Sequence, residues 1–174
     1  FPVLKTNNIK TPISDNFISK WREVVLKNPY LSITDWYNYL GGENKQGVIY
    51  KDEANQLHKK VKLKNNESPY RVLLIWMPEK MNNVAANKLL KLIEEPPKGT
   101  VILMVSEDFE QVLPTIISRM QIRKIKRFST EEVASFLENE KGIPKEKSET
   151  IAIIAKGNMN KAIQLSLNNI ADEE

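Results

Sequence analysis

The sequence predicts an α/β protein with a parallel sheet, followed by a small helical domain. Two short apolar runs rich in β-forming residues, 70–76 and 100–105, flank a helical pattern at residues 84–95. A strand, a helix and a strand in this order are typical of parallel pairing through a crossover helix. Short helical segments then follow one another toward the C-terminal end. We therefore assign residues 1–127 to the α/β domain and residues 128–174 to the helical domain.

Three helices are predicted before the first strand, because apolar residues recur there at helical spacing. They cover residues 14–27, 34–40 and 51–64. The third has a narrow apolar stripe, so we expect a surface helix in which His58 is exposed. Four aromatic residues of this part lie at helical spacing and do not alternate with basic residues, which favours packing over stacking on bases. They are Trp21, Trp36, Tyr37 and Tyr39.

The central part of the sequence carries the predicted sheet. Both apolar runs are too short for a helix and continuous enough to predict strands buried on both faces. The helix between them can begin at Asn82 or Asn83 and must end at Pro96-Pro97. A further helix around residues 109–117 and a third strand at residues 121–125 complete the predicted α/β domain.

The helical domain begins where Thr130-Glu131-Glu132 places acidic residues in a first helical turn. Three helices are expected, over residues 131–138, 145–155 and 160–167. Turn-forming residues separate them, so we predict a small three-helix domain.

Composition excludes several classes of site. The 174 residues include no cysteine and one histidine, which leaves no disulfide framework, thiolate site or histidine-rich centre, so we expect no metal. No apolar run is long enough to span a membrane and the first residues do not resemble a signal peptide, so we expect a cytoplasmic protein without a membrane partner. The net charge of +4 is compatible with a polyanionic partner.

One long sequence motif is more specific than any other part of the sequence. The sequence Ala-Ala-Asn-Lys-Leu-Leu-Lys-Leu-Ile-Glu-Glu-Pro-Pro occupies residues 85–97, and Ser118-Arg119 follows a strand later. This pattern resembles the AAA+ clamp-loader subunits of bacterial DNA polymerase III, over roughly residues 47–170. The resemblance implies a partial AAA+ domain, similar to P-loop NTPases, followed by a lid of three helices. It also implies a fragment without the family's N-terminal phosphate loop and C-terminal collar.

The positions that bind and hydrolyse ATP in this family are mostly changed. Hydrolysing members carry an acidic pair after the first strand, where one carboxylate organises Mg²⁺ and the other positions water. Trp76 and Met77 stand there instead, and Glu79 comes two residues late, behind Pro78. The glycine-rich phosphate loop does not occur in this sequence.

Two further positions bear on nucleotide sensing. Ser106 stands where the family places a polar residue that senses the γ-phosphate. Asn160 stands where hydrolysing members have a lid arginine, and Lys161 projects about 100° away around the helix. The loss of the acidic pair and of this arginine implies the non-hydrolysing branch of the family, delta prime, with no cofactor bound by this chain.

Ser118-Arg119, in contrast, is retained. The family motif is Ser-Arg-Cys, and Met120 replaces the cysteine. The resemblance implies that Arg119 acts in trans, on the ATP of an adjacent subunit, where a guanidinium neutralises charge on the transferred phosphoryl group. The implied partners are gamma/tau-type and delta-type subunits, the sliding clamp and primed DNA.

Basic residues offer possible DNA contacts, since lysine and arginine release counterions from phosphates. The resemblance implies that the helix carrying Lys88 and Lys91 faces the loader's channel, while Arg123 and Lys124 need not share one face.

Two alternative functions remain. A hydrolysing gamma/tau-type subunit conflicts with Trp76, and a stand-alone DNA-binding domain has only scattered charge in its favour.

Overall fold

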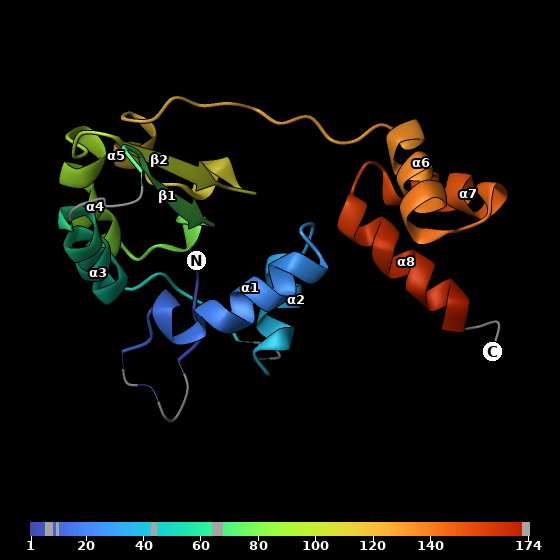
Figure 1. The fold of residues 1–174 in the computed structure, drawn as a ribbon, viewed down its shortest axis with the longest axis horizontal. Coiled ribbons are helices and arrows are strands. Elements are labelled where there is room, and N and C mark those ends of the chain that lie inside the picture. The colour runs from blue at the N-terminus through green and yellow to red at the C-terminus, as the bar shows by residue number, and fades with distance from the viewer. Residues whose placement is uncertain (6–8, 10, 43–44, 64–67, 172–174) are drawn as a thin grey trace. The chain divides into compact units, whose positions relative to one another are not determined.

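The computed structural model describes residues 1–5, 9, 11–42, 45–63 and 68–171, with only the backbone for residues 168–171 (Figure 1). The chain divides into two compact units. The first contains residues 1–24 and 33–122, and the second contains residues 25–32 and 123–174.

A parallel two-stranded sheet lies at the centre of the first unit. Strand β1 (Arg71–Trp76) pairs with β2 (Thr100–Val105) over their full lengths. Helix α4 (Asn83–Glu94) connects them, and α3 (Lys51–Lys62) packs beside α4 (Figure 1). The mixed α/β fold expected from the sequence is thus confirmed.

Local signals explain the limits of α4. The Asn82 side chain accepts a hydrogen bond from the backbone N–H of Ala85 at 2.8 Å, which is N-capping. The helix ends at Glu94, ahead of Pro96-Pro97, which cannot continue it. Its buried stripe forms the core with the sheet and consists of Ala85, Ala86, Leu89, Leu92 and Ile93.

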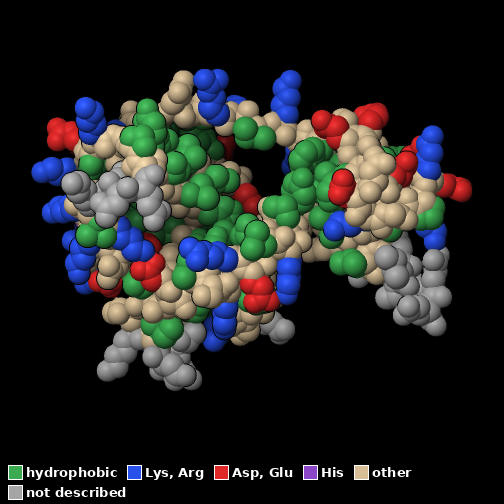
Figure 2. Space-filling model, viewed as in Figure 1, with side chains coloured by type: hydrophobic (Ala, Val, Ile, Leu, Met, Phe, Trp, Pro, Cys, Tyr) green, Lys and Arg blue, Asp and Glu red, His purple; other side chains and the backbone are tan. Residues whose placement is uncertain are grey.

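Burial of the strands on both faces was a wrong expectation. Leu73 and Ile75 point into the core, but the alternate residues Val72 and Leu74 are 58% and 60% exposed. Side chains of β2 alternate in the same way, and hydrophobic side chains reach the surface of this unit (Figure 2). The physical reason is that α3 and α4 cover one face of the sheet, and none of the residues described in this unit buries the other.

The expected helix at residues 109–117 and strand at 121–125 were also wrong. A 3-10 turn, η3 (Phe109–Gln111), is separated from α5 (Pro114–Ile117) because Pro114 restricts the preceding residue to extended backbone. Residues 121–128 are exposed and form no strand. A strand requires a hydrogen-bonded neighbour, and in the described part of the chain β1 and β2 pair only with each other.

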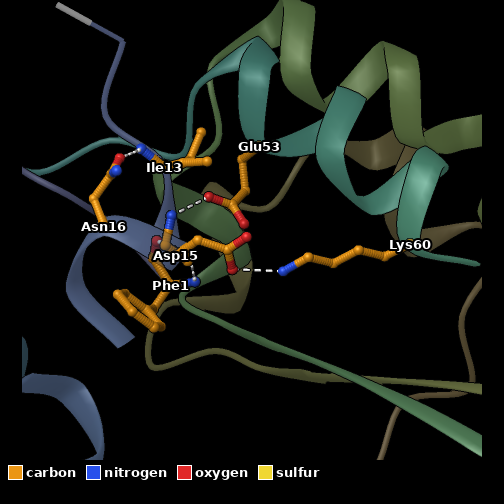
Figure 3. A network of polar contacts seen from close by, with 7 residues as sticks. Phe1, Ile13, Asp15, Asn16, Glu53 and Lys60 are labelled. Carbon is orange, nitrogen blue, oxygen red and sulfur yellow. Dashed lines mark hydrogen bonds and ion pairs between the residues drawn. The ribbon is translucent and has the colours of Figure 1, made fainter. Parts of the chain in front are cut away.

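The N-terminal segment docks onto α3 through polar contacts. Helix α1 (Ile18–Lys27) follows the 3-10 turn η1 (Ser14–Phe17). The backbone N–H of Ser14 donates to Glu53, and Lys60 pairs with Asp15, both at 2.5 Å (Figure 3). One turn of the chain is thereby joined to α3 at two positions that lie about two helical turns apart on the same face.

The aromatic residues of this part pack together, as expected. Helix α2 (Ile33–Tyr39) buries Trp36 fully, and the Trp36 indole donates to the carbonyl of Pro2 at 2.9 Å. The Trp21 ring lies 5.1 Å from the Trp36 ring, edge to face. These contacts give the residues before β1 an apolar cluster of their own.

The second unit contains the three expected helices, α6 (Thr130–Lys141), α7 (Lys145–Ala155) and α8 (Met159–Ala171). Ser129 and Glu132 form a reciprocal capping box that starts α6. Tyr30, from the segment 25–32, packs its ring edge to face against Phe128 and Phe136. A stretch from the N-terminal quarter of the chain is thus part of the core of this helical unit.

Candidate functional site

Arg119 follows the short helix α5, and its backbone is fixed by that helix. The Arg119 N–H donates to the carbonyl of Ile116 at 3.0 Å, and the Ile116 side chain is buried in the core. Pro114 at the first turn removes an N–H that would lack a partner there. The arginine is therefore carried at the end of an anchored turn.

The Arg119 guanidinium binds three acceptors of its own chain. Its Nε donates to Glu94 Oε1 at 2.5 Å, while Nη1 donates to the Thr115 carbonyl at 2.8 Å and to Ser118 Oγ at 3.1 Å. The side chain remains 34% exposed. Ser118 is therefore a direct neighbour of the guanidinium, and Glu94 is a partner that sequence reasoning missed, although it lies in the singled-out phrase.

Trp76 and Met77, at the positions of the expected acidic pair, are both used in packing. The Trp76 ring lies 4.7 Å from that of Trp21. Met77 is 1% exposed, has a left-handed backbone with φ of 58°, and donates its N–H to the Val105 carbonyl at 2.8 Å. Neither side chain offers an oxygen to Mg²⁺.

Glu79, the nearest carboxylate in sequence, is engaged elsewhere. Its Oε1 accepts from the backbone N–H groups of Glu107 and Asp108 at 3.0 and 3.3 Å. Burial, and secondarily the charge of Glu79, raises the pKa of Glu107, against a smaller opposing effect of Lys80. Glu79 thus ties the turn after β1 to the turn after β2. No sequence signal pointed to this contact, because it depends on how the strand ends are paired.

Ser106 is exposed and follows β2 directly. Because Trp76 pairs with Val105 in the sheet register, Ser106 and Met77 come next at the same edge of the sheet. The structure thereby brings Ser106, Trp76 and Met77 to the carboxyl ends of the parallel strands.

Asn160, the lid position, lies in the first turn of α8 and bonds within the helical unit. Its Oδ1 accepts a hydrogen bond from Asn28 Nδ2 at 3.0 Å. Asn28 Oδ1 in turn accepts from the N–H of Tyr30. Lys161 donates its ammonium to the carbonyl of Ile154 at 3.1 Å. The segment 25–32 therefore contacts Asn160, the position at which a lid arginine was expected to be replaced.

The basic candidates fall into two sets. Lys88 and Lys91 are exposed on α4 at a spacing of three residues, which places them on neighbouring parts of one helix face. Arg123 and Lys124 are exposed in the second unit, in the segment that precedes α6.

His58 is half-buried, and its Nε2 donates to the carbonyl of Lys88 at 2.6 Å, so the expectation of an exposed histidine was wrong.

A cluster of metal-ligating side chains and a membrane-spanning helix are both absent from the described residues. Among them, no three His, Cys, Asp or Glu side chains are placed to hold a metal ion. No helix in the same part of the chain is long and apolar enough to cross a membrane.

Comparison with known families decides the family. The family model described as "DNA polymerase III, delta subunit" matches residues 29–129. The chain belongs to this family. It is a clamp-loader-type subunit of DNA polymerase III, which agrees with the resemblance to the clamp-loader family, delta prime included.

Curated relatives match parts of this DNA polymerase III subunit. The delta' subunit of Bacillus subtilis (strain 168) is 36% identical over 73 residues, which are 42% of this chain and 22% of that protein. The tau subunit of the same organism is 30% identical over 123 residues, 66% of this chain and 21% of that protein. The delta' subunit of Pseudomonas aeruginosa is 49% identical over 49 residues, 28% of this chain and 15% of that protein. The matched segments thus span about a fifth of these relatives' lengths.

A solved structure supports the AAA+ fold of this subunit. The DNA polymerase III gamma subunit-related protein of Thermotoga maritima superposes with a TM-score of 0.54. The match covers 67% of this chain and 38% of that one, at 21% identity. At this identity the likeness concerns the fold alone.

Proposed function

We propose that this chain is part of a non-hydrolysing, delta prime-type subunit of a DNA polymerase III clamp loader. In this proposal the subunit helps to load the sliding clamp onto primed DNA, and Arg119 acts in trans on the ATP of an adjacent subunit. The observation that carries the proposal is a contrast: Met77 is buried where a catalytic carboxylate is needed, whereas Arg119 is held at the surface.

Hydrolysis in cis, of an ATP bound by this chain itself, has two chemical requirements. Phosphoryl transfer requires a metal ion between the phosphates and a residue that positions the attacking water. Trp76 packs on Trp21 and Met77 lies in the core, so these positions supply neither group. Oε1 of Glu79 accepts from two backbone N–H groups, so moving this carboxylate toward a nucleotide would break the link between the strand ends. We therefore propose a degenerate ATPase site without a bound cofactor.

Arg119 has the chemistry needed to act in trans, on the ATP of a neighbouring subunit. Arginine presents N–H donors in a planar fork that matches phosphate oxygens, and its charge is permanent. An arginine supplied in trans stabilises charge on the transferred phosphoryl group without needing a nucleotide in its own subunit. Ser118 supports this role by accepting a hydrogen bond from Nη1.

The proposed partners follow from this role. They are gamma/tau-type subunits, which would hold the ATP, a delta-type subunit, the sliding clamp and primed DNA. A replication assembly of this kind places the protein in the cytoplasm, at the nucleoid.

One observation favours the hydrolysing alternative: the tau relative aligns over 66% of this chain, more than either delta' relative described above. ATP turnover by the isolated full-length protein separates the two functions. We expect turnover by the isolated protein to be no faster than in a protein-free control, because the acidic pair is replaced. Steady turnover at rates of about 1 s⁻¹, within the range of active phosphoryl-transfer enzymes, would establish the gamma/tau-type function instead.

We also propose that Lys88 and Lys91 contact the phosphates of primed DNA, with Arg123 and Lys124 as further contacts. Replacing Lys88 and Lys91 by alanine is expected to reduce the slope of log affinity against log salt by about 2, one for each phosphate contact. Fluorescence anisotropy of labelled primed DNA with the assembled loader measures this slope. The matched control is the double alanine variant of Lys59 and Lys62, which are exposed on α3. An equal slope for both variants argues against the contact.

A further inference from the structure

We propose that Glu94 is a positioning residue that orients the Arg119 guanidinium so that Nη2 faces a neighbour's phosphates. This inference rests on the proposed function of Arg119 and adds a residue to it. The supporting geometry lies within the first unit, between the end of α4 and the turn after α5.

A count of donors shows which part of the guanidinium remains available. Arginine has five N–H donors, one on Nε and two on each terminal nitrogen. Glu94 takes the Nε donor, and the Thr115 carbonyl and Ser118 Oγ take the two on Nη1. Nη2 makes no hydrogen bond to any residue that the structure describes. Its two N–H groups are the pair left for phosphate oxygens.

The carboxylate is presented from a rigid base. Glu94 is the last residue of α4, directly after Ile93, which is buried in the core. On the other side, Ile116 anchors α5 in the same core, and α4 and α5 are in contact. Both partners of the ion pair are therefore fixed to one packed unit, and the distance between their backbones is set by that core.

Orientation, and not stability, is the effect expected of this ion pair. Both side chains are partly exposed, Arg119 at 34% and Glu94 at 45%, and exposed pairs contribute little to folding because water and salt screen them. A free arginine side chain samples many rotamers, which it must give up to meet a phosphate. Held by Glu94, the guanidinium has lost most of that freedom before the subunits meet, so the productive geometry is reached more often.

The test is ATP hydrolysis by the assembled loader in the presence of primed DNA and clamp. We expect Glu94→Ala to lower kcat by about tenfold to a hundredfold, up to the cost of a group misplaced by about 1 Å, with KM for ATP unchanged. Glu94→Gln keeps an oxygen acceptor for Nε and is expected to retain most of the rate. Glu95→Ala is the matched control, because Glu95 is adjacent and exposed, and its side chain makes no hydrogen bond or ion pair with any described residue.

A double variant separates this inference from the function on which it rests. If Glu94 acts through Arg119, then adding Glu94→Ala to Arg119→Ala slows the loader no further. The role of Glu94 is overturned if the rate of Glu94→Ala is unchanged or raised. It is also overturned if Glu94→Gln is as slow as Glu94→Ala, or if the double variant is slower than Arg119→Ala. A full rate for Arg119→Ala alone overturns the proposed function itself.

Discussion

Replacing Arg119 with alanine is expected to lower DNA-stimulated ATP hydrolysis by the assembled loader about a thousandfold at the site that Arg119 serves. The reason is electrostatic: the variant removes a permanent positive charge from the phosphoryl group at the moment when negative charge develops on its oxygens. Single-turnover hydrolysis measures this loss, because the slowed site appears as a separate slow phase in the time course.

Two variants control this experiment. Arg119→Lys keeps the charge but lacks the planar fork, so we expect it to recover only part of the rate. Arg22→Ala removes an exposed arginine from α1 and is expected to leave the rate unchanged. Thermal unfolding of the isolated subunit should be nearly the same for all three variants, since none alters the core. A normal rate for Arg119→Ala in a properly assembled loader contradicts the role in trans.

Replacing Met77 with glutamate, as if to restore part of the acidic pair, is expected to destabilise the subunit by about 3–5 kcal/mol at neutral pH. Met77 is 1% exposed, so a carboxylate at this position would be removed from water. Denaturant unfolding of the variant and the unchanged protein measures the difference. We also expect no ATP turnover by the variant, as proposed for the unchanged protein.

The pH dependence distinguishes buried charge from altered packing. Burial raises the pKa of the introduced carboxyl in the folded state above its unfolded value of about 4.3. Its charge penalty is therefore absent below about pH 4, grows as the pH rises from the unfolded toward the folded pKa, and is constant above the folded pKa. Met77→Leu, which conserves volume, is the control and should cost less than about 1.5 kcal/mol at every pH. A loss of unfolding free energy in Met77→Glu that does not vary with pH argues against burial of the charge.

Elements with strong local signals could be predicted from the sequence. Strand β2 has the expected limits, residues 100–105, and α4 begins and ends within one residue of the prediction. The reason is that the Asn82 cap and Pro96-Pro97 act within a few residues of the helix ends. The assignment of Ser118 and Arg119 to the candidate site rests on a specific motif and its spacing, and it stays a prediction.

What could not be predicted depends on contacts distant in sequence. An apolar run looks the same whether one face or both are covered, so the exposure of Val72 was missed. The Glu94–Arg119 pair joins residues 25 apart, and the Asn28–Asn160 hydrogen bond joins residues 132 apart. Periodicity carries no information about such pairs, because it reports only which side of an element is apolar.

The distribution of tryptophan gives the molecule a built-in optical label. All three tryptophans, at positions 21, 36 and 76, lie in the unit that contains the sheet, and their rings are in contact. Indole emission therefore reports the melting of that unit alone, while far-ultraviolet dichroism reports the helices of both. Comparison of the two signals along one denaturation curve separates the loss of the sheet-containing unit, which carries Arg119, from the loss of the lid helices.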